Sequence, residues 1–85
     1  MKSEHKAILA AAEKDGMLPM EKDAALIVHD MVQATRKQMA RYEVGYNKMT
    51  EKQQDTVLAD LAEAFKETAL IVARTVSYTH LRAHE

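Results

Sequence analysis

Five cationic or ionisable side chains in the middle of the chain could contact phosphate groups: Lys22, His29, Arg36, Lys37 and Arg41. Lys22, His29 and Arg36 recur every seven residues, so a helix would present them on one face. Arg36, Lys37 and Arg41 have no acidic residue three or four positions away, so pairing along the helix does not neutralise them. Their charge must therefore be balanced by solvent, by another helix or by an anionic ligand.

This basic cluster (Lys22, His29, Arg36, Lys37 and Arg41) has three interpretations. Its members could be solvated or paired with acidic residues of a later helix, which offers Asp55, Asp60, Glu63 and Glu67. They could contact a nucleic-acid backbone, although the formal net charge of −1 differs from the strongly basic balance typical of such proteins. They could also bind an acidic protein. Stacking aromatic residues are scarce, because only Tyr42 and Tyr46 lie nearby.

The other reactive residue types form no recognisable catalytic or metal-binding motif. The chain has no Cys, which removes disulfides, thiolate metal sites and thiol catalysis. His5 and His29 are far apart in sequence, and the helically spaced pair His80 and His84 lies in a terminal segment discussed below. Ser3 is the single serine of residues 1–75, and no glycine-rich phosphate loop is present. We therefore expect no enzyme activity, no metal, no cofactor and no small-molecule substrate.

The composition indicates one small domain with a weak core. One Phe, no Trp and six Met supply few large rigid side chains, and Met specifies packing poorly. A domain of this size is marginally stable by itself, so we expect support from a protein partner, from a second copy or from a missing C-terminal part of the protein. No segment approaches the roughly 20 apolar residues that span a bilayer, and no export signal is recognisable. We therefore expect a cytoplasmic protein that does not enter membranes.

Two glycines and one proline divide the chain into predicted helices. The first helix covers about residues 3–15 and ends at Gly16, where a left-handed residue is needed. The second begins at Pro19, which suits the first position of a helix, and continues to about residue 44, before Gly45.

A capping motif starts the third predicted helix. The segment Thr50-Glu-Lys-Gln53 is a capping box, and the helix that follows covers about residues 51–75. The connections are short and no β-alternation is present, so we expect an all-α fold. Its centre is an antiparallel hairpin of helices at about 19–44 and 51–75, with the short N-terminal helix, about 3–15, laid across it in a three-helix arrangement.

Each of the two long helices carries an apolar stripe, as judged at about 100° per residue. The stripe of the second helix contains Ala24, Ile27, Val28, Met31, Thr35, Met39 and Tyr42. The stripe of the third contains Val57, Leu58, Leu61, Phe65, Thr68, Ala69 and Val72. We expect these two faces to form the core.

Three apolar residues fall outside the stripes: Leu26, Val44 and Leu70. Leu26 and Leu70 project roughly opposite their stripes, and Val44 lies on the same side as Leu26. Isolated exposed leucines are common on protein surfaces and need no function. The alternative is that these three residues contact the first helix, a second subunit or further protein, which makes them the candidate partner-binding residues.

The last ten residues, VSYTHLRAHE at positions 76–85, prolong the stripe of the third helix poorly. Their back-translation resembles one reading frame of the adapter used in transposase-based preparation of sequencing libraries. The resemblance implies that residues 76–85 are a non-native tail, and that residues 1–75 are a single small helical domain from a truncated, metagenomic gene product. We expect residues 77–85 to pack poorly.

The segments PMEKDAALIVHDMV (positions 19–32) and RYEVG (positions 41–45) resemble the N-terminal part of uncharacterised proteins encoded by tailed phages and prophages. The resemblance covers residues 7–75 and contains no diagnostic motif. It implies a phage origin, and with it a role in contacts with host proteins or host DNA in the host cytoplasm.

Two hypotheses follow from the sequence. The first is a non-enzymatic helical module that binds another protein or a second copy through apolar burial. The alternative is an accessory nucleic-acid-binding protein that contacts phosphates through the basic cluster on the second helix. Pairing of that cluster with the acidic residues of the third helix would distinguish them, because a neutralised cluster has little charge left for phosphate.

Overall fold

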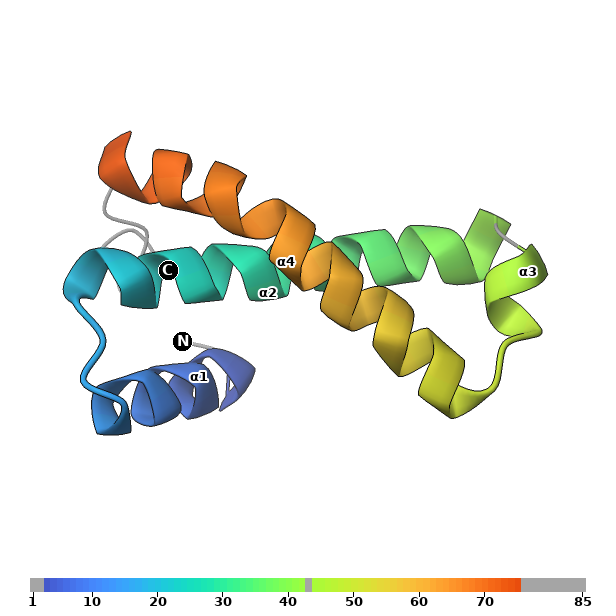
Figure 1. Ribbon diagram of the computed structural model, residues 1–85, viewed down its shortest axis with the longest axis horizontal. Helices are drawn as coiled ribbons and strands as arrows, with labels where there is room; N and C mark the ends of the chain where they lie inside the picture. Colours follow the sequence, from blue (N-terminus) through green and yellow to red (C-terminus); the bar gives the residue numbers. More distant parts are fainter. Residues whose placement is uncertain (1–2, 43, 76–85) are drawn as a thin grey trace.

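The computed structural model describes residues 3–42 and 44–75. They form four helices: α1 (Ser3–Lys14), α2 (Pro19–Tyr42), α3 (Val44–Asn47) and α4 (Glu51–Thr75). α4 runs back along α2 and crosses it, while α1 lies against the first half of α2 on another side (Figure 1). The expected all-α hairpin with a short N-terminal helix is confirmed. The tail at 76–85, and with it the expectation of poor packing, lies outside the described residues.

A left-handed glycine ends α1. Gly16 has a φ of 71°, and its N–H donates to the carbonyl of Glu13 at 3.1 Å. The N–H of Met17 donates to the carbonyl of Ala12 at 3.0 Å. Together these bonds satisfy carbonyls that the last helical turn leaves free. The predicted glycine stop of the first helix is therefore confirmed.

Side-chain caps start both long helices. At α4, the N–H of Gln53 donates to Thr50 Oγ1 at 3.2 Å and the N–H of Thr50 donates to Gln53 Oε1 at 2.9 Å. These are the two reciprocal bonds of the predicted capping box. At α2, the N–H of Leu18 donates to Glu21 Oε1 at 3.0 Å, and the carboxylate also suits the positive end of the helix.

The end of α2 differs from the prediction. The helix ends at Tyr42, and Gly45 lies inside the short helix α3 rather than terminating α2. The side-chain amide of Asn47 donates to the carbonyl of Ala40 at 2.7 Å. This bond satisfies, from outside the helix, one of the carbonyls that the last turn of α2 leaves free.

The core lies between α2 and α4, and small residues dominate it. Its buried centre consists of Ala24, Ile27 and Ala69. Packed against this centre are the partly buried side chains of Val28, Met31, Leu70, Val72 and Ala73. Alanine methyl groups let two helices approach closely but bury little apolar area, which limits the stabilisation they provide. The expected weakness of the core agrees with this arrangement.

Two residues of the predicted stripes are exposed. Thr68 of α4 is exposed beside the buried Ala69, so it lies at the edge of its stripe. Tyr42, at the end of the α2 stripe, is 68% exposed, whereas Tyr46 in α3 is buried. The reason is visible in the crossing of the two helices: because α4 crosses α2 at an angle, a stripe drawn along the whole of either helix cannot stay in contact (Figure 1).

The two glycines provide a matched test of this backbone geometry. We expect Gly16→Ala to lower the free energy of unfolding by about 1 kcal/mol, because L-residues are strained in the left-handed region. We expect Gly45→Ala to raise it by about 0.4–1 kcal/mol, since alanine restricts the unfolded chain and suits a helix. Neither added Cβ meets an atom within 4 Å. Urea denaturation measures both changes, and shifts of the same sign would contradict the assignment.

Candidate functional site

The surface feature best suited to recognition is an apolar groove of about 330 Å³ between α2 and α4. Its apolar lining consists of Met17, Ala24, Ala25, Val28, Ala62 and Leu70. The alanines explain the hollow, because their side chains are too short to fill the space between the two helix backbones. The groove therefore lies directly beside the core cluster, with which it shares Ala24, Val28 and Leu70.

One charged residue from each helix borders this groove. Glu21 comes from α2 and Lys66 from α4, and both are exposed. Neither side chain forms an ion pair within residues 3–42 and 44–75. The groove thus combines an apolar floor with one negative and one positive wall. Such a combination can bury apolar groups of a ligand while its charges select orientation.

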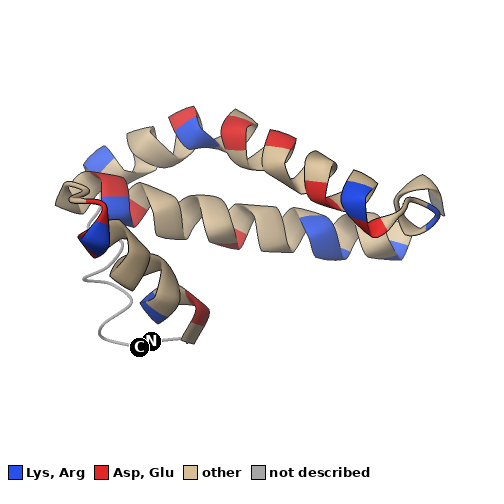
Figure 2. Ribbon diagram, turned by 60° about the horizontal axis from the view of Figure 1, so that its bottom comes forward, with Lys and Arg blue, Asp and Glu red and all other residues tan. Residues whose placement is uncertain are grey.

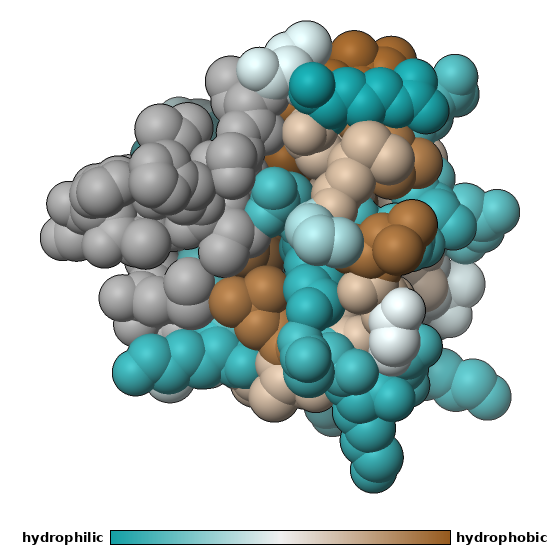
Figure 3. All heavy atoms as spheres, turned by 90° about the vertical axis from the view of Figure 1, so that its left-hand side faces the viewer, coloured by the Kyte–Doolittle hydropathy of each residue, from teal (hydrophilic) through white to brown (hydrophobic). Residues whose placement is uncertain are grey.

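Further apolar side chains reach the surface near the connection between α1 and α2. Met17 is 37% exposed and Leu18 is 63% exposed. Viewed from this end, the molecule shows hydrophobic surface between hydrophilic side chains (Figure 3). Single exposed hydrophobic residues are normal, but here Met17 belongs to the groove lining, which extends the apolar surface beyond the two helices.

The structure brings together only three of the five residues in the basic cluster. His29, Arg36 and Lys37 line a polar pocket of about 440 Å³ on α2. Lys22 instead forms an ion pair with Glu13 of α1, and Arg41 lies over the ring of Tyr42 at 5.9 Å. The five residues are therefore not one continuous phosphate-binding surface.

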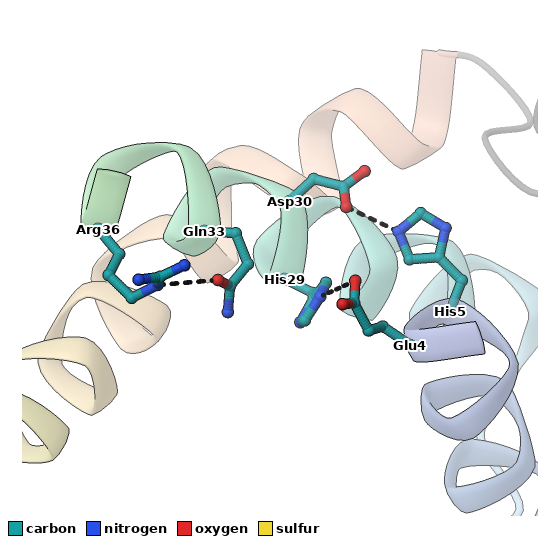
Figure 4. A network of polar contacts seen from close by, with 6 residues as sticks. All are labelled: Glu4, His5, His29, Asp30, Gln33 and Arg36. Carbon is teal, nitrogen blue, oxygen red and sulfur yellow. Dashed lines mark hydrogen bonds and ion pairs between the residues drawn. The ribbon is translucent and has the colours of Figure 1, made fainter. Parts of the chain in front are cut away.

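The polar pocket contains both signs of charge. Besides its three basic residues, it is lined by Glu4, Asp30, Gln33, Ala34 and Gln38. The Nε of Arg36 donates to Gln33 Oε1 at 3.0 Å, and His29 Nε2 lies 3.6 Å from Glu4 Oε2 (Figure 4). Because two carboxylates share this pocket with the cations, its charge does not select anions strongly.

The acidic residues of α4 do not neutralise the basic cluster. Asp55, Asp60, Glu63 and Glu67 are all exposed. Within the described part of the chain, no ion pair joins them to Arg36, to Lys37 or to Arg41. Figure 2 shows acids distributed along α4 and cations toward the far end of α2. Within the described residues, the structure therefore lacks the ion pairs between α2 cations and α4 acids that were considered from the sequence.

The N-terminal helix is attached to α2 by polar contacts that the sequence did not reveal. His5 is fully buried, and its Nε2 lies 2.7 Å from Asp30 Oδ1 in a hydrogen bond between α1 and α2 (Figure 4). The His5 ring also packs edge to face against the His29 ring, with centroids 5.9 Å apart. A histidine that belongs to no recognisable sequence motif is therefore a buried anchor between α1 and α2.

A second polar contact lies at the other end of α1. The ammonium group of Lys22 donates a hydrogen bond to the Glu13 carboxylate. This bond and the attraction of the positive charge lower the pKa of the Glu13 carboxyl. Because the pair is exposed to solvent, we expect it to orient α1 more than to stabilise it.

The candidate partner-binding residues have different positions. Leu26 is fully buried, so the interpretation of an exposed leucine is wrong for this residue, and it offers no surface to an external partner. Leu70 is partly buried and lines the apolar groove. The side chain of Val44 lies outside the described part of the structure. Leu70 is therefore the residue of this set that the structure places in a candidate site.

Sequence reasoning missed most of the groove. Ala25, Ala62 and Lys66 attracted no attention because alanines and lysines on helices are common. The usable signal was the spacing of Ala62, Lys66 and Leu70, which puts them on one side of α4. Finding the groove also required the crossing of α2 and α4, which is a tertiary property.

The described residues do not assemble a metal site or a membrane span. Among them, no group of three or more His, Cys, Asp or Glu side chains is placed to hold a metal ion. In the same part of the chain, no helix has the length and apolarity needed to cross a bilayer.

Comparison with protein-family models, with curated proteins and with solved structures gave no significant match to this chain.

The anchoring role of His5 can be tested against its exposed neighbour. We expect His5→Ala to lower the free energy of unfolding by about 2–3 kcal/mol, since it removes a hydrogen bond and a buried ring. Lys6→Ala, on the exposed side of α1, should change it by less than about 0.5 kcal/mol. Urea denaturation followed by helical circular dichroism measures both. Equal effects of the two substitutions would show that the ring does not anchor α1.

Proposed function

We propose that this chain is a non-enzymatic helical module that binds another helix through the apolar groove between α2 and α4. The observation that carries the proposal is the groove itself, with its alanine floor and its opposed charges Glu21 and Lys66. Amphipathic helices commonly bind such grooves with their apolar face. The small core supports the proposal, because a bound helix would add apolar burial where the fold has little.

The proposed phage origin is compatible with this function but does not determine it. The residues that resemble phage proteins include Ala24, Ala25 and Val28 of the groove. If the chain is phage-encoded, the bound helix would belong to a phage or host protein. Binding of selected helices to the groove can be measured without knowing which protein supplies the natural helix.

The groove can be tested with helices selected from a library of amphipathic peptides displayed against the full chain. We expect the selected helices to lose at least about tenfold in affinity for Ala25→Arg, because the long charged side chain would occupy the groove floor. Ala64→Arg is the matched control, since Ala64 is exposed on α4 and does not line the groove. Circular dichroism verifies that both variants fold. Helices that bind wild type and Ala25→Arg equally would contradict the proposal.

A second candidate function is binding to a nucleic-acid backbone. The observation in its favour is that Arg36, Lys37 and Arg41 have no ion-pair partner among the described residues. Mixed charge in the polar pocket makes this candidate weaker, and so does the absence of Phe, Tyr and Trp from the lining of that pocket among the described residues. We therefore rank it below the helix-binding function.

Salt dependence tests this second candidate. If three cations contact phosphates, affinity for duplex DNA should fall by about 40-fold between 50 and 200 mM salt, through loss of counterion release. The double variant Arg36→Glu/Lys37→Glu should abolish binding in fluorescence anisotropy. The control double variant Lys6→Glu/Lys14→Glu changes the net charge by the same amount at exposed positions of α1. It should retain most of the DNA binding. Equal binding by both double variants would exclude the basic cluster as the contact surface.

A further inference from the structure

The groove carries charges of opposite sign on opposite walls, and this arrangement is self-complementary. Glu21 lies on the α2 wall and Lys66 on the α4 wall. We propose that this face binds a second copy of the chain, whose α4 and α2 pack against the α2 and α4 walls of the groove, so that the module forms a two-fold symmetric dimer. This inference rests on the proposed helix-binding function and specifies its partner.

Symmetry explains why a second copy fits the charges. In a two-fold dimer the same surface patch meets itself. If the axis runs along the groove, the α2 wall of one copy faces the α4 wall of the other. Glu21 of each copy then lies opposite Lys66 of the other, and both interactions are attractive. A dimer with the axis across the groove would instead place Glu21 against Glu21, so the charges favour one orientation.

The charges are available for this pairing. Glu21 uses Oε1 to accept the hydrogen bond from the Leu18 N–H, which holds the carboxylate at the start of α2. Lys66 is exposed and has no ion pair within the described residues. Neither group therefore has an ion-pair partner from its own chain in that part of the structure.

The apolar lining supplies the driving force for association. Ala25 and Ala62 allow the backbones of two copies to approach, while Met17 and Leu70 project apolar side chains beside the hollow. A specific interface needs about 600 Å² from each copy. That is about a tenth of the 6134 Å² accessible surface of the chain, so the contact would extend from the groove over neighbouring exposed side chains such as Leu18.

Charge reversal and mixing provide the decisive experiment on the full 85-residue chain. Glu21→Lys makes both walls positive and Lys66→Glu makes both negative, so each variant alone should self-associate about tenfold more weakly than wild type. An equimolar mixture should recover association as a heterodimer, because every wall then faces its opposite charge. Sedimentation velocity over a concentration series measures the self-association of the wild type, of each variant and of the mixture.

Controls separate this pairing from general charge attraction and from misfolding. Glu63→Lys and Lys52→Glu carry the same charge changes at exposed positions of α4 outside the groove, and mixing them should give no recovery. Glu21→Gln/Lys66→Gln retains a side chain that can cap α2 and should weaken association by about threefold. Circular dichroism of each variant confirms its helix content before mixing.

The outcomes distinguish this inference from the function on which it rests. Recovery on mixing supports the two-fold pairing. A wild-type chain that stays monomeric up to its solubility limit overturns the second copy as partner, and so does a mixture that behaves as the average of its components. In either case, selected helices that bind wild type but not Ala25→Arg would leave the helix-binding function standing. If no selected helix distinguishes wild type from Ala25→Arg either, both the dimer and the helix-binding function are overturned.

Discussion

The contact of Ala24 and Ile27 with Ala69 determines most of this structure. Two methyl groups and one branched side chain let α2 and α4 approach closely at this point. The partly buried Val28 and Leu70, which directly follow Ile27 and Ala69 in the sequence, pack against the same cluster. A close approach made by small side chains therefore produces both the hairpin and the hollow beside it.

Because this core buries little apolar area, directional contacts have unusual importance elsewhere in the fold. The capping box at Thr50 and Gln53 fixes the start of α4, and the Asn47 amide closes the end of α2. Similarly, the His5 hydrogen bond to Asp30 joins α1 to α2. Each such bond contributes only about 1 kcal/mol. A burial-poor domain nevertheless loses a large fraction of its stability with any one of them.

Local chemistry made the helix starts and the first helix end predictable. Pro19, Gly16 and Thr50 act through their own backbone or through residues three positions away, so a single sequence contains the whole signal. The end of α2, predicted at about residue 44, lies at Tyr42, and its last turn receives a hydrogen bond from Asn47, seven residues after Ala40. Tyr42 was wrong as a core residue because helical periodicity cannot show where two crossing helices separate.

The candidate site was less predictable than the fold for the same physical reason. His5 becomes buried through a bond to a residue 25 positions away, and no local pattern encodes that partner. The basic cluster looked continuous on one helix, but Lys22 is drawn to Glu13 of α1. Conversely, the groove forms only where α2 and α4 lie together. Of the candidate partner-binding residues whose side chains the structure describes, Leu70 lines it and Leu26 does not.

The alanines of the groove can be understood from two requirements on this surface, which are the stability of the hairpin and the space for a bound helix. A hairpin selected for stability alone would gain from larger side chains at Ala25 and Ala62, since filling a hollow adds apolar burial. Those larger side chains would also close the groove to another helix. Opposed charges at Glu21 and Lys66 add little affinity in solvent, but they penalise pairings that bring like charges together. Apolar burial would then set the strength of association, and the two charges would set which orientation of the bound helix is accepted.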